Sequence, residues 1–392
     1  MKTYLNPGLW QKKLFLAFLA LSVLACSITP DILPTPGGIT IPPASPTPGG
    51  TQIIENNGSL KEIPLQVGYG VRGSFYELFF TDPTSPEADR EEGGPDKQLV
   101  AAIDSARISV DVAAYSFSLY SIQRALLNAF NRGVQVRVVM ESDNMTDSVP
   151  QALQGAGIPM IGDQRQGLMH DKFIIIDRNE VWTGSMNFTY SGTYADNNNL
   201  IRIRSSQLAD DYTVEFEEMF KDDFFGPDVV AQTPYPNIKI DGTYLDVYFS
   251  PDDHPARHIA ALLRGAEQSI YIMAYSFTAN DFGDIIKQKA RDGLVVKGVV
   301  DETQTKSAGS EFQAFQKAGL PIYVDGNPGL MHHKVIIIDQ QIVITGSYNF
   351  TASAERTNDE NLLVIYDKQI AAQYMAEFER VYAKAQKKPK KP

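Results

Sequence analysis

The chain has 392 residues, of which 43% are apolar and 21% are charged, a balance typical of one large or two medium globular domains. Its net charge of −12 argues against a broadly basic surface for nucleic acid, although a local positive cleft can lie on an acidic body. The single cysteine, Cys26, excludes an intrachain disulfide.

Residues 1–25 are predicted to form a signal peptide. Lys2, Lys12 and Lys13 precede a short apolar run, residues 14–24, which suits a signal peptide better than a membrane-spanning helix. A small residue before a lone cysteine resembles a bacterial lipoprotein signal, which implies cleavage before Cys26 and a lipid on its sulfur. We therefore expect a protein anchored on the extracytoplasmic face of the cell membrane. The alternatives are an uncleaved anchor and a plain signal peptide with an incidental cysteine.

Two segments flank the predicted globular part. Residues 26–60 are rich in proline, glycine, serine and threonine, so they cannot bury a core and are expected to form an extended linker between anchor and body. Residues 387–392 form a basic tail. We interpret the tail as a solvated terminus, with weak attraction to anionic lipid as the alternative.

Strand and helix signals alternate through residues 61–225. Residues 121–133 have helical spacing that stops at Gly133, and residues 177–180 are expected to form a hairpin turn. The Ser-x-Asn-Phe-Thr run after the last of these strand signals supplies capping residues for a following helix. The expected strands are residues 107–117, 134–141, 158–162, 173–177 and 181–185.

The same order of signals returns in residues 226–386, which predicts a duplicated domain with lobes at 61–225 and 226–386. Ala114–Phe117 recurs as Ala274–Phe277. Solenoid repeats are shorter and more numerous, so that architecture is not expected. The alternation predicts an α/β fold in which each lobe contains a mixed β-sheet flanked by helices.

One motif, H-x-K-x4-D-x6-G-S-x-N, occurs in each lobe, and the two copies are 162 residues apart. Six matching positions at fixed spacing do not arise twice by chance. The first copy contains His170, Lys172, Asp177, Gly184, Ser185 and Asn187. The second copy contains His332, Lys334, Asp339, Gly346, Ser347 and Asn349.

These residue types suit chemistry at a phosphate. A histidine and a lysine two positions apart on a strand lie on one face, as His170 and Lys172 do. The imidazole can attack phosphorus or donate a proton, and the ammonium can neutralise nonbridging oxygens. The serine hydroxyls and asparagine amides can donate hydrogen bonds to the same oxygens. Asp177 and Asp339 are candidates for catalysis, but we favour a role in ending strands and fixing turns.

The paired motifs resemble those of the phospholipase D superfamily, and the resemblance covers about residues 61–386. It implies two lobes related by a pseudo-two-fold axis that meet at one cleft. It also implies that one histidine becomes a phosphohistidine while the other protonates the leaving oxygen, with no metal or other cofactor. Because both motifs lie in one chain, a monomer is expected.

The family also places an acidic residue downstream of each histidine to hold its working tautomer. Glu360 lies 28 residues after His332 and fits this role, whereas the aligned residue of the first lobe is Asn198. An acidic partner raises the pKa of a histidine. We therefore predict that Glu360 pairs with His332, that His332 is the proton donor, and that His170 is the nucleophile. Asp196 is an alternative partner in place of the missing acid, and His333 is interpreted as a neighbour of the site.

The expected function is cleavage of a phospholipid headgroup, from a phosphatidylcholine-like lipid to phosphatidic acid, by a membrane-anchored enzyme. The principal alternative is an endonuclease that cleaves DNA or RNA phosphodiesters. A phosphatidyltransferase of the cardiolipin synthase kind is a third hypothesis, and a non-catalytic surface binding protein is a fourth. The motifs themselves do not separate water from an alcohol as the acceptor.

Overall fold

The computed structural model describes residues 60–388. The predicted signal peptide, Cys26, almost all of the linker and the last four residues of the basic tail lie outside the described residues, so their assignments stay predictions. Within residues 60–388, none of the helices has the length and apolar character needed to cross a membrane.

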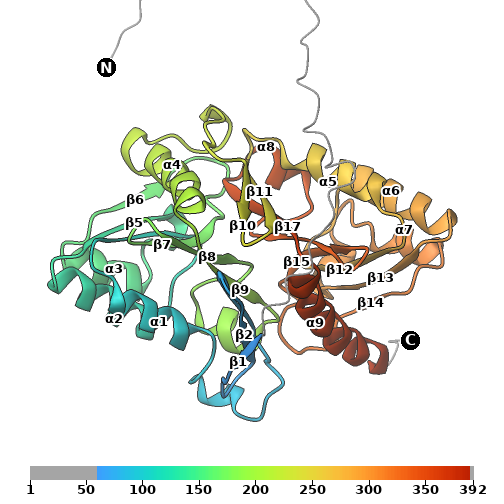
Figure 1. The fold of residues 1–392 in the computed structure, drawn as a ribbon, viewed down its shortest axis with the longest axis horizontal. Helices are drawn as coiled ribbons and strands as arrows, with labels where there is room; N and C mark the ends of the chain where they lie inside the picture. Colours follow the sequence, from blue (N-terminus) through green and yellow to red (C-terminus); the bar gives the residue numbers. More distant parts are fainter. Residues whose placement is uncertain (1–59, 389–392) are drawn as a thin grey trace, which may run out of the picture. The chain divides into compact units, whose positions relative to one another are not determined.

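The first lobe contains a nine-stranded mixed sheet with the order β1-β2-β3-β9-β8-β7-β4-β5-β6 (Figure 1). Strands β4, β5 and β6 are parallel to one another, and the remaining neighbours are antiparallel. The strands are β1 Lys61–Ile63, β2 Tyr69–Arg72, β3 Tyr76–Phe80, β4 Ser109–Ala114, β5 Gln135–Glu141, β6 Met160–Asp163, β7 Lys172–Ile176, β8 Glu180–Gly184 and β9 Asn199–Arg204.

The second lobe repeats this arrangement in an eight-stranded sheet with the order β10-β11-β17-β16-β15-β12-β13-β14. Here β12, β13 and β14 are the parallel strands. Two mixed sheets of corresponding order confirm the predicted duplicated α/β fold. The strands are β10 Asn237–Ile240, β11 Thr243–Ser250, β12 Ser269–Ala274, β13 Val295–Val300, β14 Ile322–Val324, β15 Lys334–Ile338, β16 Ile342–Gly346 and β17 Glu360–Tyr366.

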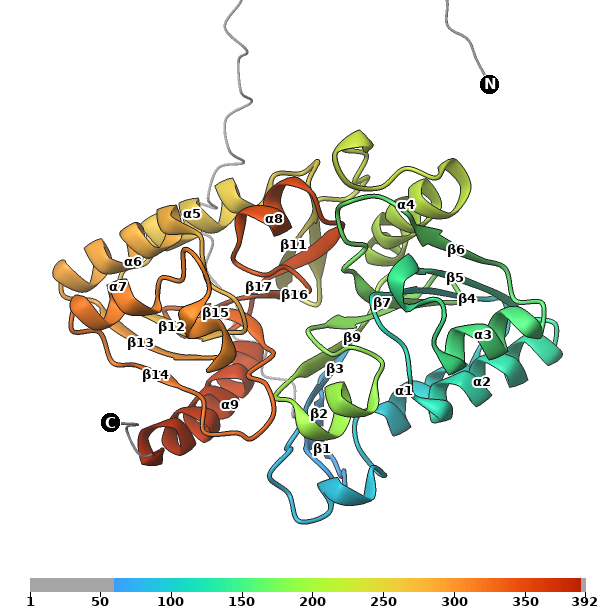
Figure 2. The ribbon, with the colours of Figure 1, turned by 180° about the vertical axis from the view of Figure 1, so that it is seen from behind.

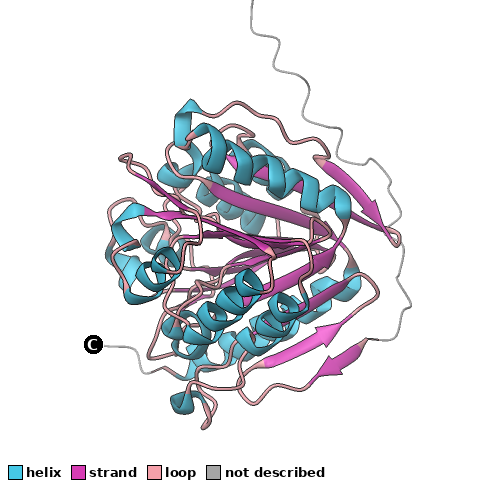
Figure 3. Cartoon of the chain, turned by 90° about the vertical axis from the view of Figure 1, so that its left-hand side faces the viewer, coloured by secondary structure: helices cyan, strands magenta, loops and turns pink. Residues whose placement is uncertain are grey.

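Helices cover both faces of each sheet (Figures 2 and 3). Helices α1–α3 lie on one face of the first sheet and α4 on the other, while α5–α7 and α9 cover the second sheet in the same way (Figures 1 and 2). The helices are α1 Asp96–Ser105, α2 Tyr120–Asn131, α3 Ser148–Gly155, α4 Ser206–Asp222, α5 Pro255–Gly265, α6 Asn280–Arg291, α7 Phe312–Lys317, α8 Ala352–Arg356 and α9 Lys368–Lys387.

Burial on both faces explains the unbroken apolar runs in the motif strands. All five residues of β7 and all five of β15 are buried, so these strands show no alternation of polar and apolar residues. The predicted capping after each motif is also present. Thr351 Oγ1 accepts a hydrogen bond from Ala354 N at the start of α8, and Thr189 Oγ1 accepts one from Gly192 N in the single-turn segment Ser191–Ala195.

The two lobes meet along a seam that joins the start of each motif to the other lobe. Met169 pairs in parallel with Asp359, and Asn197 pairs in parallel with Met331. As a result, His170 N donates to Asp359 O at 3.0 Å and His332 N donates to Asn197 O at 3.0 Å. The backbone N–H group of each motif histidine is therefore bonded to a residue of the opposite lobe that lies just before a strand.

Two buried asparagines reinforce this seam. Asn199 Nδ2 donates to Thr345 Oγ1 and Tyr374 OH, both at 3.0 Å. The related Asn361 Oδ1 accepts from Thr183 Oγ1 at 2.7 Å and from Tyr212 OH at 3.2 Å. Because both asparagines are fully buried, an unmatched amide there would be costly, and these bonds specify one packing of the lobes.

Candidate active site

Each motif places a histidine and a lysine on the same strand face and beneath a tyrosine. Lys172 Nζ donates to His170 O at 2.6 Å and lies 5.1 Å from the centroid of the Tyr115 ring. Lys334 repeats this geometry with His332 O at 2.8 Å and the Tyr275 ring at 5.0 Å. The two tyrosine rings also pack on the imidazoles, with centroid distances of 4.9 and 5.1 Å. The side chains of the lysines and histidines are thus fixed before any substrate arrives.

The two motifs share one electrostatic environment. Burial, followed by the charges of Lys172 and Lys334, lowers the pKa of His170 well below its usual value. Burial and the same two lysines, together with His170, lower the pKa of His332. Burial also lowers the pKa of Lys172 to about 8 and that of Lys334 well below its usual value. Four basic side chains that perturb one another in this way are matched by an anionic phosphate.

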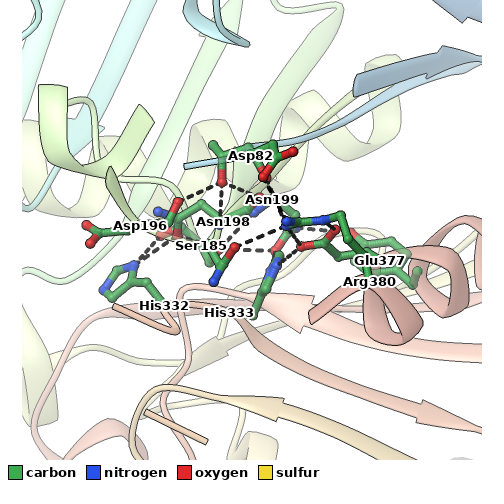
Figure 4. A network of polar contacts seen from close by, with 12 residues as sticks. Asp82, Ser185, Asp196, Asn198, Asn199, His332, His333, Glu377 and Arg380 are labelled. Atoms are coloured by element: carbon green, nitrogen blue, oxygen red, sulfur yellow. Dashed lines mark hydrogen bonds and ion pairs between the residues drawn. The ribbon is translucent and has the colours of Figure 1, made fainter. Parts of the chain in front are cut away.

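The imidazoles have different Nδ1 partners, and these partners come from opposite lobes. His170 Nδ1 lies 2.7 Å from Glu360 Oε2. His332 Nδ1 lies 2.9 Å from Asn198 Oδ1 and 3.1 Å from the backbone oxygen of Ser185 (Figure 4). Asn198 Nδ2 donates to Gly192 O, so its Oδ1 faces the ring. The predicted pairing of Glu360 with His332 was therefore wrong, because the crossed seam places residue 360 beside His170.

Glu360 is held on more than one side. Asn358 Nδ2 approaches its Oε1 at 3.3 Å while Oε2 faces His170. Burial raises the pKa of Glu360 to about 7, and Lys172 and Ser347 act against that increase. The residue is completely buried, so it contributes to the site through the imidazole. Glu360 therefore positions the ring of His170, which corrects the prediction that it contacts substrate.

The motif serines also position other residues. Ser185 Oγ donates to Asn198 Oδ1 at 2.8 Å, and Ser347 Oγ accepts from Asn361 N at 3.0 Å. Both serines are completely buried, which corrects the prediction that they contact substrate. Asn187 and Asn349 remain candidates for binding phosphate oxygens. They are partly exposed, and each has a buried Oδ1 without a hydrogen-bond partner.

Asp177 and Asp339 are structural, which corrects their placement among the catalytic residues and agrees with the favoured turn interpretation. Asp177 lies at the end of β7 opposite His170, with a positive φ of 52°. Its carboxylate accepts the backbone N–H groups of Arg107, Ile108 and Ser109. Asp339 does the same for Glu267, Gln268 and Ser269.

The motif glycines permit the close approach that brings the Nδ1 partners into place. Gly184 has φ +145°, and a Cβ atom there would lie 2.4 Å from Asn199 O. Gly346 has φ +143°, and a Cβ atom there would lie 2.2 Å from Asn361 O. A side chain at Gly184 would push β8 away from β9, which begins just after Asn198, and one at Gly346 would push β16 away from β17, which carries Glu360.

Two predictions about neighbouring residues have different outcomes. Asp196 Oδ1 accepts from Leu330 N at 2.9 Å, so it does not replace the missing acid beside His332. His333 lies on the opposite strand face, where it contacts Asn199 Oδ1 at 3.2 Å and Glu377 Oε1 at 3.0 Å. It is a neighbour of the site, as predicted.

Sequence reasoning missed two acidic anchors at the ends of aligned strands. Glu141 Oε2 accepts from Met169 N, and Asp301 Oδ2 accepts from Met331 N, both at 3.0 Å. Each bond fixes the residue just before a motif histidine. The signal was present as an acid at the end of each VV-containing strand in both lobes. Among residues 60–388, no group of three or more histidines or acids is placed to hold a metal ion.

The geometry defines a class: a two-lobed α/β enzyme in which paired histidine–lysine motifs form one phosphate site. The family described as "Cardiolipin synthase, PLD-like domain" matches residues 99–220 and 259–382, and the chain belongs to it and thus to the phospholipase D superfamily. The protein is accordingly a phosphodiesterase of the phospholipase D type.

Two relatives agree with this placement, and one solved structure shares the fold. A phospholipase D of Rickettsia bellii (strain RML369-C) is 32% identical over 171 residues, which are 42% of this chain and 81% of that protein. The mitochondrial cardiolipin hydrolase of Homo sapiens is 33% identical over 127 residues, or 32% of this chain and 50% of that protein. The phosphatidylserine synthase of Haemophilus influenzae Rd KW20 shares the fold, with a TM-score of 0.56 at 15% identity over 84% of this chain and 88% of that one.

The aspartate assignment can be tested by unfolding. Asp177→Ala is expected to lower the free energy of unfolding by about 1–3 kcal/mol, because three backbone donors lose a charged acceptor. Urea unfolding measures this change, and initial rates at a temperature where both proteins are folded should be similar. Asp339→Ala is the matched variant. A large loss of turnover with unchanged stability would return Asp177 to the catalytic residues.

Proposed function

We propose that the protein hydrolyses phospholipids of the phosphatidylcholine kind at the headgroup ester, through a phosphohistidine on His170, and leaves phosphatidic acid. The observation that carries the role of His170 is its 2.7 Å contact with Glu360. Attack by Nε2 on phosphorus leaves a positively charged ring, and a carboxylate at Nδ1 stabilises that charge. His332 has only neutral acceptors at Nδ1, so its ring has no such stabilisation.

Proton transfer in both steps is accounted for by His332, while His170 carries the phosphoryl group. The phosphodiester anion offsets the repulsion from Lys172 and Lys334, so His332 can hold a proton on Nε2. As the bond from His170 Nε2 to phosphorus forms, the bond to the headgroup oxygen breaks and that oxygen takes the proton from His332. In the second step His332 removes a proton from water, whose oxygen displaces His170 from phosphorus. The proposal keeps His170 as nucleophile and His332 as proton donor. Its ground is the carboxylate beside His170, whereas the sequence-based prediction relied on a carboxylate beside His332.

Charge around the site supports a lipid over a nucleic-acid strand. Glu141 and Asp143 act on Tyr115, and Asp301 and Asp196 act on Tyr275: after burial, these carboxylates raise the pKa of the tyrosine that packs on each histidine. Negative charge near the site disfavours a strand with a phosphate at every nucleotide more than a zwitterionic lipid, which presents one phosphate and a cation. Two relatives are themselves called phospholipase D and cardiolipin hydrolase.

The cellular setting belongs to the same proposal and is supported by the sequence. The signal and Cys26 favour a lipid anchor on the extracytoplasmic face, where the linker would hold the site next to its substrate. A single chain supplies both histidines and both Nδ1 partners, which supports a monomeric enzyme.

The substrate class is decided by offering two substrates to the full chain in the presence of a chelator. Phosphatidylcholine vesicles should release choline, and single-stranded DNA should stay intact. Choline is measured by an enzyme-coupled assay and DNA by gel. DNA cleavage without choline release would favour the endonuclease. Choline release that depends on an added alcohol would favour the phosphatidyltransferase.

The roles of the histidines are separated by an activated leaving group. With a p-nitrophenyl phosphodiester, His332→Ala should still form a phosphorylated enzyme, because p-nitrophenolate leaves without a proton, whereas His170→Ala should form none. Phosphate bound to protein after a rapid quench into alkaline detergent, in which the N–P bond of a phosphohistidine is stable, is the measurement. A phosphorylated His170→Ala enzyme would exchange the two roles.

Because only His170 has a carboxylate partner, variants of Glu360 and Asn198 are expected to have different effects. Glu360→Gln should slow formation of the phosphorylated enzyme on the order of 10²-fold, because the charged ring loses its stabilising carboxylate. Asn198→Asp adds a carboxylate beside His332 and should raise the pH at which turnover falls on the alkaline side. Single-turnover rates and pH profiles report these effects. An unchanged rate in Glu360→Gln would remove the ground for His170 as nucleophile.

A further inference from the structure

The face of each motif strand that points away from the histidine carries a buried ionisable pair. The residue between histidine and lysine is Asp171 in the first lobe and His333 in the second, and both are completely buried. The helix behind each strand supplies a glutamate at aligned positions, Glu215 on α4 and Glu377 on α9. The two lobes therefore offer the same framework with different charges.

In the second lobe these charges are balanced. His333 Nε2 lies 3.0 Å from Glu377 Oε1, and Arg380 donates to Glu377 at 2.7 Å and to Asp82 at 3.0 Å (Figure 4). Arg380 also donates to Asn197 Oδ1 at 3.0 Å, and Asn197 holds the backbone of His332. Burial alone would raise the pKa of Glu377, but Arg380 and His333 hold it below its usual value.

Around the first motif strand the corresponding positions are acidic. Glu218 aligns with Arg380 and Asp359 aligns with Asn197. Burial and the charges of nearby acids raise the pKa of Asp171 to about 7 and those of Glu215 and Asp359 well above their usual values. One oxygen each of Asp171, Asp359 and the neighbouring Asp252 is buried without a hydrogen-bond partner. We call Asp171, Glu215 and Asp359 the carboxyl cluster.

The charged and titratable groups around the cluster do not neutralise it. Most of them are acids, and the cations act on single members: Lys172 on Asp171 and Arg165 on Asp359. The facing groups are Asp163 and Arg165 before the first motif, Lys172 on β7, Asp211, Tyr212 and Glu218 on α4, Asp252 after β11, and Glu360 on β17. Buried carboxyl groups without neutralising cations favour their protonated, uncharged forms.

The carboxyl cluster is bonded directly to the segment that carries Glu360. Asp171 Oδ1 accepts from Asn361 Nδ2 at 2.6 Å, on one side of Glu360. Asp359, on the other side, accepts His170 N through its backbone oxygen, and its Oδ1 accepts from Gly226 N. Movement of this segment would shift both Glu360 and the backbone of His170.

We propose that Asp171, Glu215 and Asp359 form a proton-loaded clamp that positions Glu360 on His170. As the cluster ionises, repulsion among its carboxylates opposes the hydrogen bonds from Asn361 and Gly226 and releases that half-site. The His332 half-site, held by Arg380, has no such dependence. For a substrate whose leaving group needs no proton from His332, the clamp therefore predicts that kcat/KM falls as the pH rises and that this fall arises at the His170 half-site. The proposal rests on the proposed chemistry at His170, but its effect on stability does not.

The direction in which pH changes the folding stability follows from the number of protons that the folded and unfolded states bind. In the unfolded chain these acids lose their protons near pH 4. In the folded protein burial raises the pKa of Asp171 to about 7, and burial with the charges of nearby acids raises the pKa of Glu215 and of Asp359 well above the usual values. Between these values the folded state binds more protons, so the stability contributed by the cluster is complete below about pH 4 and is lost as the pH rises through 7. Glu377 has the opposite sign, because its folded pKa is lowered and its contribution is lost as the pH falls.

Glu215→Gln tests the clamp, because glutamine resembles a permanently protonated glutamate. In the full chain, the fall in melting temperature between pH 5 and 8 should become flatter, and the alkaline limb of kcat/KM for a p-nitrophenyl phosphodiester should move up by about one pH unit or more. Asp171→Asn should act in the same direction, since its side-chain oxygen can still accept from Asn361. The second variant keeps the test decisive if the first folds poorly.

Glu377→Gln is the matched control on the other lobe. It should lower the melting temperature throughout this pH range, because Arg380 and His333 lose their partner, and should leave the alkaline limb in place. If Glu215→Gln flattened the change of melting temperature with pH but left the alkaline limb of kcat/KM in place, the cluster would affect stability only. That result would overturn the clamp. An unmoved stability profile would overturn it regardless of substrate. Stabilisation of the unmodified protein by millimolar CaCl2 at pH 8, absent in Glu215→Gln, would show that a cation replaces the protons and would also overturn it.

Discussion

The crossed seam between the lobes is the constraint on which the site depends. Each motif histidine takes its backbone acceptor and its Nδ1 partner from the opposite lobe: His170 from Asp359 and Glu360, and His332 from Asn197 and Asn198. Neither lobe alone holds its own imidazole. The buried amides of Asn199 and Asn361 specify this packing, because a shifted seam would leave them without partners.

Concentration of positive charge is the second consequence of that seam. Burial and two lysines keep both imidazoles neutral in the resting site, which suits a nucleophile that needs a free Nε2 lone pair. The lysines are fixed by carbonyl oxygens and tyrosine rings, so they need little reorganisation when a phosphate arrives. Their mutual repulsion is relieved by the substrate's own charge, which favours binding of a phosphodiester.

Duplication gave the two halves one framework, and substitution then made them different. The carboxylate of Glu360 and the amide of Asn198 occupy equivalent places but favour different charge states of the imidazoles. Behind the motif strands, Arg380 balances the second lobe whereas Glu218 adds another acid to the first. Two chemical steps with opposite proton demands fit two half-sites that differ in this way.

The sequence alone determined the repeat, the α/β class, the motif strands and the turn roles of Asp177 and Asp339, because each depends on local periodicity or on spacing within one lobe. It also identified the histidines and lysines, since two strand positions of the same parity share a face. Only the tertiary structure decided that Glu360 serves His170 and that Ser185 and Ser347 are buried behind the site. Spacing within one lobe carries no information about the partner lobe, because that pairing is set by how two folded surfaces pack.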